Sequence, residues 1–299
     1  MVVYIELDMK KLIFLKILLV YSFTNAQVNE NMLLERFNMN AFNPAFTGVE
    51  GRGLSFTNRN TNSGVAGAPK LNYFYYNGNH KNNLAFGFSV IDNKVFIDQR
   101  TMYTLDASYK IQVSGEQIVY LGVKGGVHTK FTDIDAIQRL PGVPANPAIP
   151  EITKETYPVI GFGFLYKLKS LFFSASVPNF LNPKNYTDDI SFIGSQKPST
   201  YLLAGATIPI GVFNSTFNPY LSQKIVPGIG NTTHFGGTID YKGVIEFGGG
   251  YKSTKYFNVM AILSTKIGLS IGYGYDFRGE ANDVEVQKTG TEIFLKYNF

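Results

Sequence analysis

The chain has 299 residues, of which 15% are aromatic, with 30 Gly, no Cys, no Trp and a formal net charge of +5. The lack of Cys excludes disulfides, thiol catalysis and Cys-ligated metal sites, and the small, scattered basic excess differs from the concentrated patch of a nucleic-acid-binding protein. After the leader described next, no apolar run is long enough for a membrane-spanning helix, which excludes a helical membrane protein.

The first segment has the pattern of a secretory signal peptide. Met9-Lys10-Lys11 is a basic start, residues 17–23 are a short apolar core, and Thr24-Asn25-Ala26 is a small-residue cleavage site. We therefore expect residues 1–26 to be a signal peptide with its true start at Met9, and the protein to be exported.

The next segment, residues 27–51, has no clean period and contains Asn43-Pro44-Ala45-Phe46-Thr47-Gly48. Pro44 disfavours the α conformation at the residue before it, and Gly48 permits a turn. We expect residues 27–51 to form an ordered arm on the periplasmic side that leads into the first strand and could fill part of a barrel lumen.

From residue 52 to 299, segments in which apolar and polar side chains alternate follow one another, which is the period of β-strands. In one of the clearest, Tyr103 and Leu105 alternate with Thr104 and Asp106. The first segment, with Leu54 and Phe56, is weak, the second has Leu71, Tyr73 and Tyr75 as its apolar face, and a segment around residues 217–224 has no clear faces. The last strand has one apolar face, and its residues are Ile293, Leu295, Tyr297 and Phe299.

The apolar faces of the well-patterned strands carry no charge. A Lys or Arg there would cost about 2–4 kcal/mol at the midplane of a bilayer, whereas a solvated sheet face has no such restriction. A soluble sandwich would also leave the edge of the last strand uncovered, but a barrel closes on it. This pattern favours a lipid-facing surface over a soluble sandwich.

The predicted connections alternate in length, as they do when strands run up and down. The odd-numbered, mostly long ones span about residues 60–70, 92–100, 131–157, 178–198, 225–233, 252–255 and 277–289. The even-numbered, short ones fall near residues 78–82, 114–116, 169, 210–214, 243 and 265. We therefore predict an all-β fold: a single transmembrane up-and-down antiparallel β-barrel of about 14 strands over residues 52–299, with short periplasmic turns and long extracellular loops.

Few residues have the pattern of a catalytic or metal site. The three His residues, His80, His128 and His234, lack ligand spacing, so we expect no metal, no cofactor and no enzyme activity; a barrel enzyme that uses His128 or His234 is one alternative. A stiff, Pro-rich stretch is a candidate partner-contact loop or, alternatively, a loop folded over the pore mouth. Its prolines are Pro141, Pro144, Pro147 and Pro150.

Several of these stretches resemble the PorP/SprF family of outer-membrane proteins. Asn43, Pro44, Ala45, Phe46 and Gly48 match the N-P-A-[YF]-x-G motif of that family. Further similar stretches are Gly67-Ala68-Pro69, Ala107-Ser108-Tyr109, Ser174-Ala175-Ser176-Val177-Pro178-Asn179 and Tyr273-Gly274-Tyr275-Asp276. The family often has R-x-Q-W after the first strand, where this chain has Arg59-Asn60-Thr61-Asn62 and no Trp.

The resemblance implies a non-enzymatic outer-membrane barrel of the Bacteroidetes type IX secretion and gliding system. Members of the family support export or surface attachment of particular secreted proteins, such as gliding adhesins. The implied partners are the C-terminal domain of a secreted cargo protein, periplasmic secretion components and outer-membrane lipid. The expectation is a partner-specific anchor or accessory of type IX secretion, and the alternative is a porin or transporter for small solutes.

Overall fold

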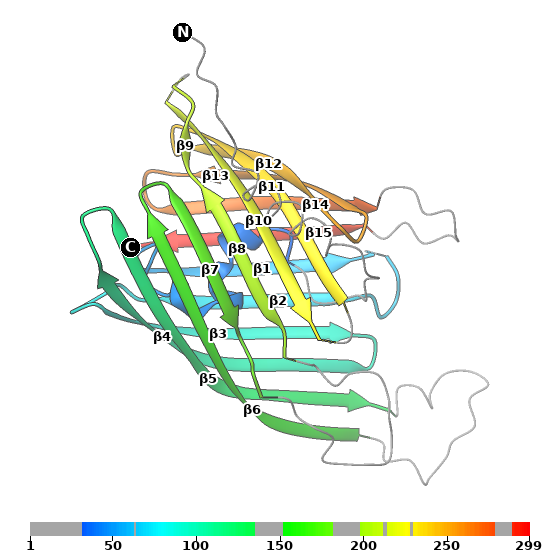
Figure 1. The fold of residues 1–299 in the computed structure, drawn as a ribbon. Helices are drawn as coiled ribbons and strands as arrows, with labels where there is room; N and C mark the ends of the chain where they lie inside the picture. The colour runs from blue at the N-terminus through cyan, green and yellow to red at the C-terminus, as the bar shows by residue number, and fades with distance from the viewer. Residues whose placement is uncertain are drawn as a thin grey trace, which may run out of the picture.

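The computed structural model describes residues 32–62, 64–134, 152–181, 198–211, 214–227, 230–278 and 289–299, and within these ranges the chain is one antiparallel sheet closed into a barrel (Figure 1). Three short helical segments precede the first strand: η1 (Glu35–Phe37), α2 (Met39–Phe42) and η2 (Pro44–Phe46). Of the helices in the described ranges, none has the length and apolar character needed to cross a membrane.

The strands follow one another around the barrel in chain order. They are β1 (Gly53–Thr61), β2 (Lys70–Asn77), β3 (Leu84–Val95), β4 (Asp98–Gln112), β5 (Gln117–Asp133), β6 (Ile152–Leu168), β7 (Leu171–Val177), β8 (Thr200–Ala206), β9 (Ile208–Pro209), β10 (Ser215–Val226), β11 (Gly230–Tyr241), β12 (Ile245–Lys252), β13 (Tyr256–Ser264), β14 (Leu269–Arg278) and β15 (Gly290–Asn298). β8 and β9 both pair with β10 and are one barrel strand interrupted at Thr207. The described ranges therefore form a closed 14-stranded barrel, which confirms the predicted fold class.

The first and last strands close the barrel. β15 pairs with β14 on one side and with β1 on the other, in a register that joins Gly53 to Asn298 and Thr61 to Gly290. The N–H of Phe299 donates to the carbonyl oxygen of Arg52 at 3.1 Å. Neither strand is left with a free edge, which is how a barrel avoids edge-to-edge aggregation.

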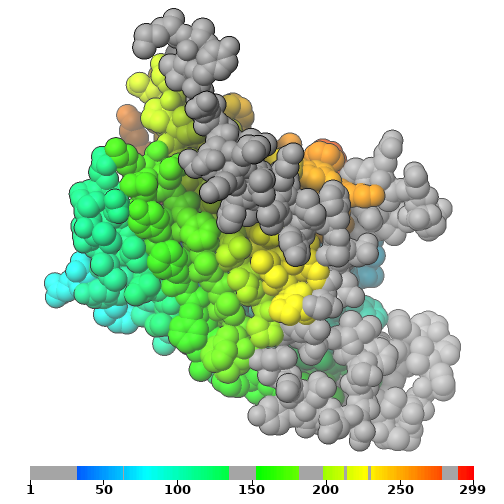
Figure 2. Space-filling model, in the orientation of Figure 1, coloured from blue at the N-terminus to red at the C-terminus, as the bar shows by residue number. Residues whose placement is uncertain are grey.

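The two faces of the wall have opposite character. On β4, Leu105 is 67% exposed on the outside, while the alternate residues Thr104 and Asp106 are buried inside. The same alternation repeats around the barrel, and its outer surface is a belt of exposed Leu, Val, Ile, Phe and Tyr side chains. In the space-filling view, β4 to β8 form a continuous wall (Figure 2). An apolar belt of this extent is stable only against lipid.

The face predicted to be apolar and outward on the second strand lies inside the barrel. Tyr73 and Tyr75 of β2 are buried inside the barrel, whereas Phe74 points outward and is exposed. Both faces of this strand are aromatic, so the period alone does not tell which one meets lipid. The inner pair packs with Met32 and Ala41, which precede the first strand. In β10, which lacked clear faces in the sequence, Phe217 lies outside and Tyr220 inside.

The connections differ in length as predicted, with two corrections. The expected loop at residues 225–233 is mostly strand, because β10 runs to Val226 and β11 begins at Gly230. The even-numbered ones are tight: at β2–β3, Asn82 and Asn83 both have positive φ, the backbone of a two-residue hairpin turn. The predicted long loop at 92–100 is instead mostly strand, and only Phe96 and Ile97 connect β3 to β4. Polar side chains of β3 and β4 bond one another across this strand pair; for example, the side chain of Gln99 donates to the carboxylate of Asp92 at 2.8 Å.

Candidate functional site

The lumen holds residues 32–51, the described part of the predicted arm, and this segment is called the arm below. Its residues Leu33, Leu34, Ala45 and Thr47 are almost completely buried. α2 ends at Phe42 because Pro44 disfavours a helical conformation at Asn43, which is extended. The helical segments of the arm lie within the ring of strands (Figure 1). The polar atoms of a chain in this position must find partners on the inner wall, and three anchors and one seat supply them.

The first anchor is the carboxylate of Glu292 in β15. It accepts hydrogen bonds from the backbone N–H groups of Leu33 at 2.6 Å and Leu34 at 3.1 Å. The guanidinium of Arg59 in β1 lies 3.7 Å from the same carboxylate and bonds Asp276 of β14 at 2.7 Å. The start of the arm is thus held at the seam where the barrel closes.

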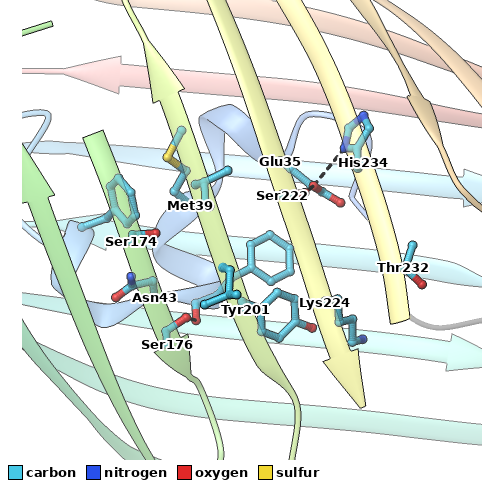
Figure 3. A pocket seen from close by; sticks show the side chains of 14 residues that line it. Glu35, Met39, Asn43, Ser174, Ser176, Tyr201, Ser222, Lys224, Thr232 and His234 are labelled. Atoms are coloured by element: carbon cyan, nitrogen blue, oxygen red, sulfur yellow. Dashed lines mark hydrogen bonds and ion pairs between the residues drawn. The ribbon is translucent and has the colours of Figure 1, made fainter. Parts of the chain in front are cut away.

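The second anchor is Glu35 of the arm. Its carboxylate accepts from Ser222 at 3.0 Å, lies 3.0 Å from Nδ1 of His234 and pairs with Lys252 at 3.1 Å. Figure 3 shows Glu35 and His234 pointing toward one another across the inner wall. Burial opposes ionisation of this carboxyl, but the attraction of Lys252 and His234 outweighs it and holds the pKa of Glu35 well below its ordinary value. Glu35 is therefore a carboxylate at neutral pH.

The third anchor is Arg36, the next residue. Its guanidinium pairs with Glu246 of β12 and donates to the hydroxyl of Thr238 in β11 at 2.7 Å. Glu35 and Arg36 thus bind two opposite charges on the same strand, Lys252 and Glu246 of β12, so these two charges of the arm are neutralised within the lumen. Removing one partner of a buried pair leaves an uncompensated charge, which costs several kcal/mol, and these pairs therefore fix the position of the arm.

The seat is formed by the 43–48 motif (Asn43, Pro44, Ala45, Phe46, Thr47, Gly48) against β4, β5 and β6. The side chain of Asn43 accepts from the N–H of Ala45 at 2.8 Å and donates to the carbonyl of Phe164 at 3.0 Å. Ser108 of β4 donates to the carbonyl of Ala45 at 3.2 Å. Asn43 therefore caps the short η2 segment and joins it to the wall with one amide group.

Two wall glycines make room for the seat. A Cβ on Gly122 of β5 would overlap the backbone of Pro44 and Ala45, and a Cβ on Gly163 of β6 would overlap the amide of Asn43. Any side chain at either position would push the motif away from the wall. Gly122 thus permits close approach of the Pro44–Ala45 backbone, and Gly163 makes room for the side chain of Asn43.

The end of the motif turns toward the tight β2–β3 connection. Thr47 shares a 2.8 Å hydrogen bond with the hydroxyl of Tyr75, and the N–H of Gly48 donates to the amide oxygen of Asn77 at 2.7 Å. Gly48 has φ +80°, and a Cβ there would overlap Ala85 and His80. Only Gly fits both this backbone conformation and this space.

Between the arm and β7, β8, β10 and β11 lies a cavity of about 40 Å³ (Figure 3). This volume holds only a few water molecules. Its lining is partly polar and includes Ser174, Ser176, Tyr201 and Lys224. The space is therefore too small for a solute.

The residues predicted as sites fall in different places. The 43–48 motif lies inside the lumen and faces the wall rather than the surface. The four prolines of the predicted partner-contact loop, at positions 141, 144, 147 and 150, lie outside the described residues. Among the last-strand residues Ile293, Leu295, Tyr297 and Phe299, all are exposed on the outer face.

The candidate His residues have structural partners. His234 bonds Glu35, and its Nε2 lies 3.0 Å from the amide of Asn258 and 3.3 Å from the hydroxyl of Tyr220. His128 is on β5, across the barrel in the strand order. In the ranges that the structure describes, no three His, Asp or Glu side chains gather as a metal site would require.

Sequence reasoning missed the charged anchors. Their signal was present: Glu246, Lys252 and Glu292 are isolated charges on the inner faces of otherwise apolar or small-residue strands, and Glu35 and Arg36 are adjacent opposite charges in the arm. What the sequence did not contain was the pairing, since it joins residues about 200 positions apart, such as Glu35 and His234 with a separation of 199.

The comparisons with known proteins agree with this architecture. A family model described as type IX secretion system membrane protein PorP/SprF matches residues 31–297. None of the curated proteins has a matching sequence. Among solved structures, a FadL homologue of Pseudomonas aeruginosa is similar with 12% identity, a TM-score of 0.51, and coverage of 87% of this chain and 94% of that one. The toluene transporter TodX of P. putida has 9% identity, a TM-score of 0.52, and coverage of 88% and 94%. At these identities the likeness concerns the fold alone.

Proposed function

The chain belongs to the PorP/SprF family of type IX secretion system membrane proteins, and on that premise we propose that it is a plugged outer-membrane barrel that serves as a partner-specific anchor or accessory of protein secretion. Its location in the outer membrane follows from the family and the barrel fold. The proposed partners are a secreted surface protein or gliding adhesin, engaged through its C-terminal domain, and periplasmic components of the secretion system.

The observation that carries this proposal is the arm fixed across the lumen. Glu35, Arg36 and Glu292 join it to β10–β12 and β15, and the 43–48 motif joins it to β4–β6 on the other side. An arm held at both ends by buried charges and hydrogen bonds braces the wall and blocks the path of a solute. A porin has a polar, water-filled interior instead.

The 43–48 motif has a structural part in this proposal. Because it is buried against Gly122 and Gly163, it seats the arm and does not itself contact an external partner. The contact surface then consists of the parts of the barrel outside the lumen, among them the loop with Pro141, Pro144, Pro147 and Pro150. We also assign residues 1–26 to a cleaved leader, residues 27–51 to the arm and residues 52–299 to the barrel, with the tight turns in the periplasm.

The alternative is a porin or transporter of small solutes, which predicts steady single-channel conductance of the purified protein in planar bilayers. The anchor predicts a barrel that does not conduct until the arm is displaced. The two functions therefore differ in one electrical measurement on the unmodified protein.

The test of partner binding is a tagged pull-down from detergent-solubilised outer membranes of the native host, with mass spectrometry of the copurifying proteins. We expect a large secreted protein or secretion-system components at near-stoichiometric yield. A barrel that repeatedly purifies alone and conducts ions would overturn the anchor and favour the porin.

A further inference from the structure

One strand of the barrel is paired on only part of one side. β6 pairs with β5 along its whole length, from Ile152 with Asp133 to Leu168 with Gln117. With β7 it pairs only over residues 162–168. Within the described ranges, the edge of β6 over residues 152–161 therefore has no strand beside it on the β7 side. In Figure 1, β5 and β6 extend well past the end of β7.

The chain turns away from this edge where β7 ends. The N–H of Phe180 donates to the carbonyl of Ile160 at 2.8 Å, and the side chain of Asn179 accepts from the N–H of Leu181 at 3.2 Å. Leu181 is no longer in a strand. The last backbone bond from this side thus reaches Ile160, and the ladder stops there.

Alternate residues of a strand direct their backbone N–H and C=O groups to the same neighbouring strand, so the side that each remaining residue of the edge faces follows from Ile160. Because Ile160 bonds toward β7, the residues two, four and six positions before it, Pro158, Thr156 and Lys154, direct their backbone groups to the same side. Pro158 has no N–H to offer, and open edges are among the few places where Pro is tolerated in a sheet. Among the residues that the structure describes, none bonds the N–H and C=O of Thr156 and Lys154 or the C=O of Pro158 on this side.

The edge is held in an extended conformation before any partner arrives. β3 to β6 remain paired to their far ends, with Val95 opposite Asp98, Asp98 opposite Thr132, and Asp133 opposite Ile152. A preformed edge of this kind binds an extended segment by main-chain hydrogen bonds, and little conformational entropy of the receptor is lost.

We propose that the edge of β6 at residues 154–158 is a docking site for an extended β-strand of a secreted protein, which adds antiparallel to β6 in the lane that β7 leaves. The choice of occupant rests on the proposed function, since a secretion-family barrel meets exported chains, and β-strand addition is the mode that the open backbone groups of Thr156 and Lys154 offer. Lys154 projects outward beside the edge and favours a strand with an acidic residue at the facing position.

The experiment is photo-crosslinking in native outer membranes, with p-benzoylphenylalanine placed in the full chain at position 154 or 156. The matched control is position 129, because Thr129 lies directly opposite Thr156 on β5 but is covered by strands on both sides. We expect the labels at 154 and 156 to form adducts with one segment of one exported protein, and the label at 129 to form none. The two crosslinked sites on that segment should lie about two residues apart, in the order that an antiparallel strand requires.

A pair of variants separates the backbone from the side chain. Thr156→Pro removes the edge N–H, whereas Thr156→Ala removes only the hydroxyl that contacts Thr129. With a label at 154, we expect the adduct to fall about tenfold in Thr156→Pro and to persist in Thr156→Ala. Heat-modifiable migration on gels shows whether each variant is folded. If the Pro variant fails to fold, the labels at 154 and 156 in the chain without the Thr156→Pro substitution still test the register of the docked strand on β6.

Three results would overturn the proposal: adducts to residues 178–199 of the same chain, adducts to lipid or to no protein, or equal adduct yields in the two Thr156 variants. Its failure is distinct from that of the proposed function. If the pull-down still recovers a secreted partner while the edge gives no adduct, the anchor stands and the partner binds elsewhere; if neither is found, both fail.

Discussion

Gly163→Ala is the substitution that best tests whether the arm depends on its seat. The added Cβ would overlap the amide oxygen of Asn43 and lie 3.0 Å from Cδ of Pro44. Neither neighbour is the end of a long, flexible side chain, so the motif itself must shift. Overpacking of this kind costs about 1–3 kcal/mol. The fraction of time that the arm is away from the wall should then rise about 5- to 150-fold.

The assay uses the lack of Cys in the natural chain. Ala41→Cys places a single thiol in α2, at a position only 4% exposed and packed against Tyr73 and Tyr75. A maleimide reacts with it only when the arm opens, so the labelling rate reports the open fraction. Planar-bilayer recordings on the same protein should show brief conducting events at a frequency that rises with the labelling rate.

The matched control is Gly125→Ala, on the neighbouring strand β5. A Cβ there meets nothing within 4 Å, and the position lies on the outer face between Val123 and Val127. This substitution changes the same residue type without touching the arm. If Gly163→Ala and Gly125→Ala give equal labelling rates, the seat does not hold the arm and the reasoning from the close contact between Gly163 and Asn43 is wrong.

Two further substitutions test the anchors and the membrane belt. Glu35→Gln removes the charge that Lys252 and His234 face and should lower the free energy of unfolding at pH 7 by about 2 kcal/mol. Because the pKa of Glu35 is depressed in the folded state, this difference between the two proteins should be fully present above about pH 4.5 and should disappear as the pH falls through the folded-state pKa. Urea titrations at several pH values would show it. The loss of stability caused by a charge on the outer face should depend on its depth in the membrane. Leu105→Arg should destabilise the barrel in lipid vesicles by about 2–4 kcal/mol, whereas Ile267→Arg, in the tight turn after β13, should cost about 1 kcal/mol or less. Equal losses of stability would argue against a bilayer at the level of Leu105.

The barrel itself could be predicted because its signal is local. In β4 and β15 each residue shows its face by alternation with its neighbours, and lipid forbids charge on one of the two faces. The same rule failed for β2, where Tyr73 inside and Phe74 outside are both aromatic. It failed again at 92–100, because strands that rise beyond the lipid carry polar side chains on both faces and look like a loop.

The candidate site could be predicted only in outline. The 43–48 motif was visible as a motif, and an arm in the lumen was an open possibility. Its contacts could not be predicted, because Gly122 and Gly163 look like any other strand glycines until the 43–48 motif is seen to lie against them. A glycine that admits another segment has the same sequence signal as one that fills a strand for any other reason, and only the distance between strands and arm tells them apart.

The bond between Glu292 and the start of the arm has a consequence for the order of assembly. The residues that it joins, Leu33 and Glu292, are 259 positions apart, so this contact is among the most non-local in the molecule and forms late for reasons of chain entropy. The last strand has to arrive before Leu33 and Leu34 of the arm can be fixed. A nascent barrel that lacks β15 therefore keeps a loose arm, and a firmly held arm signals that the whole sheet has been completed.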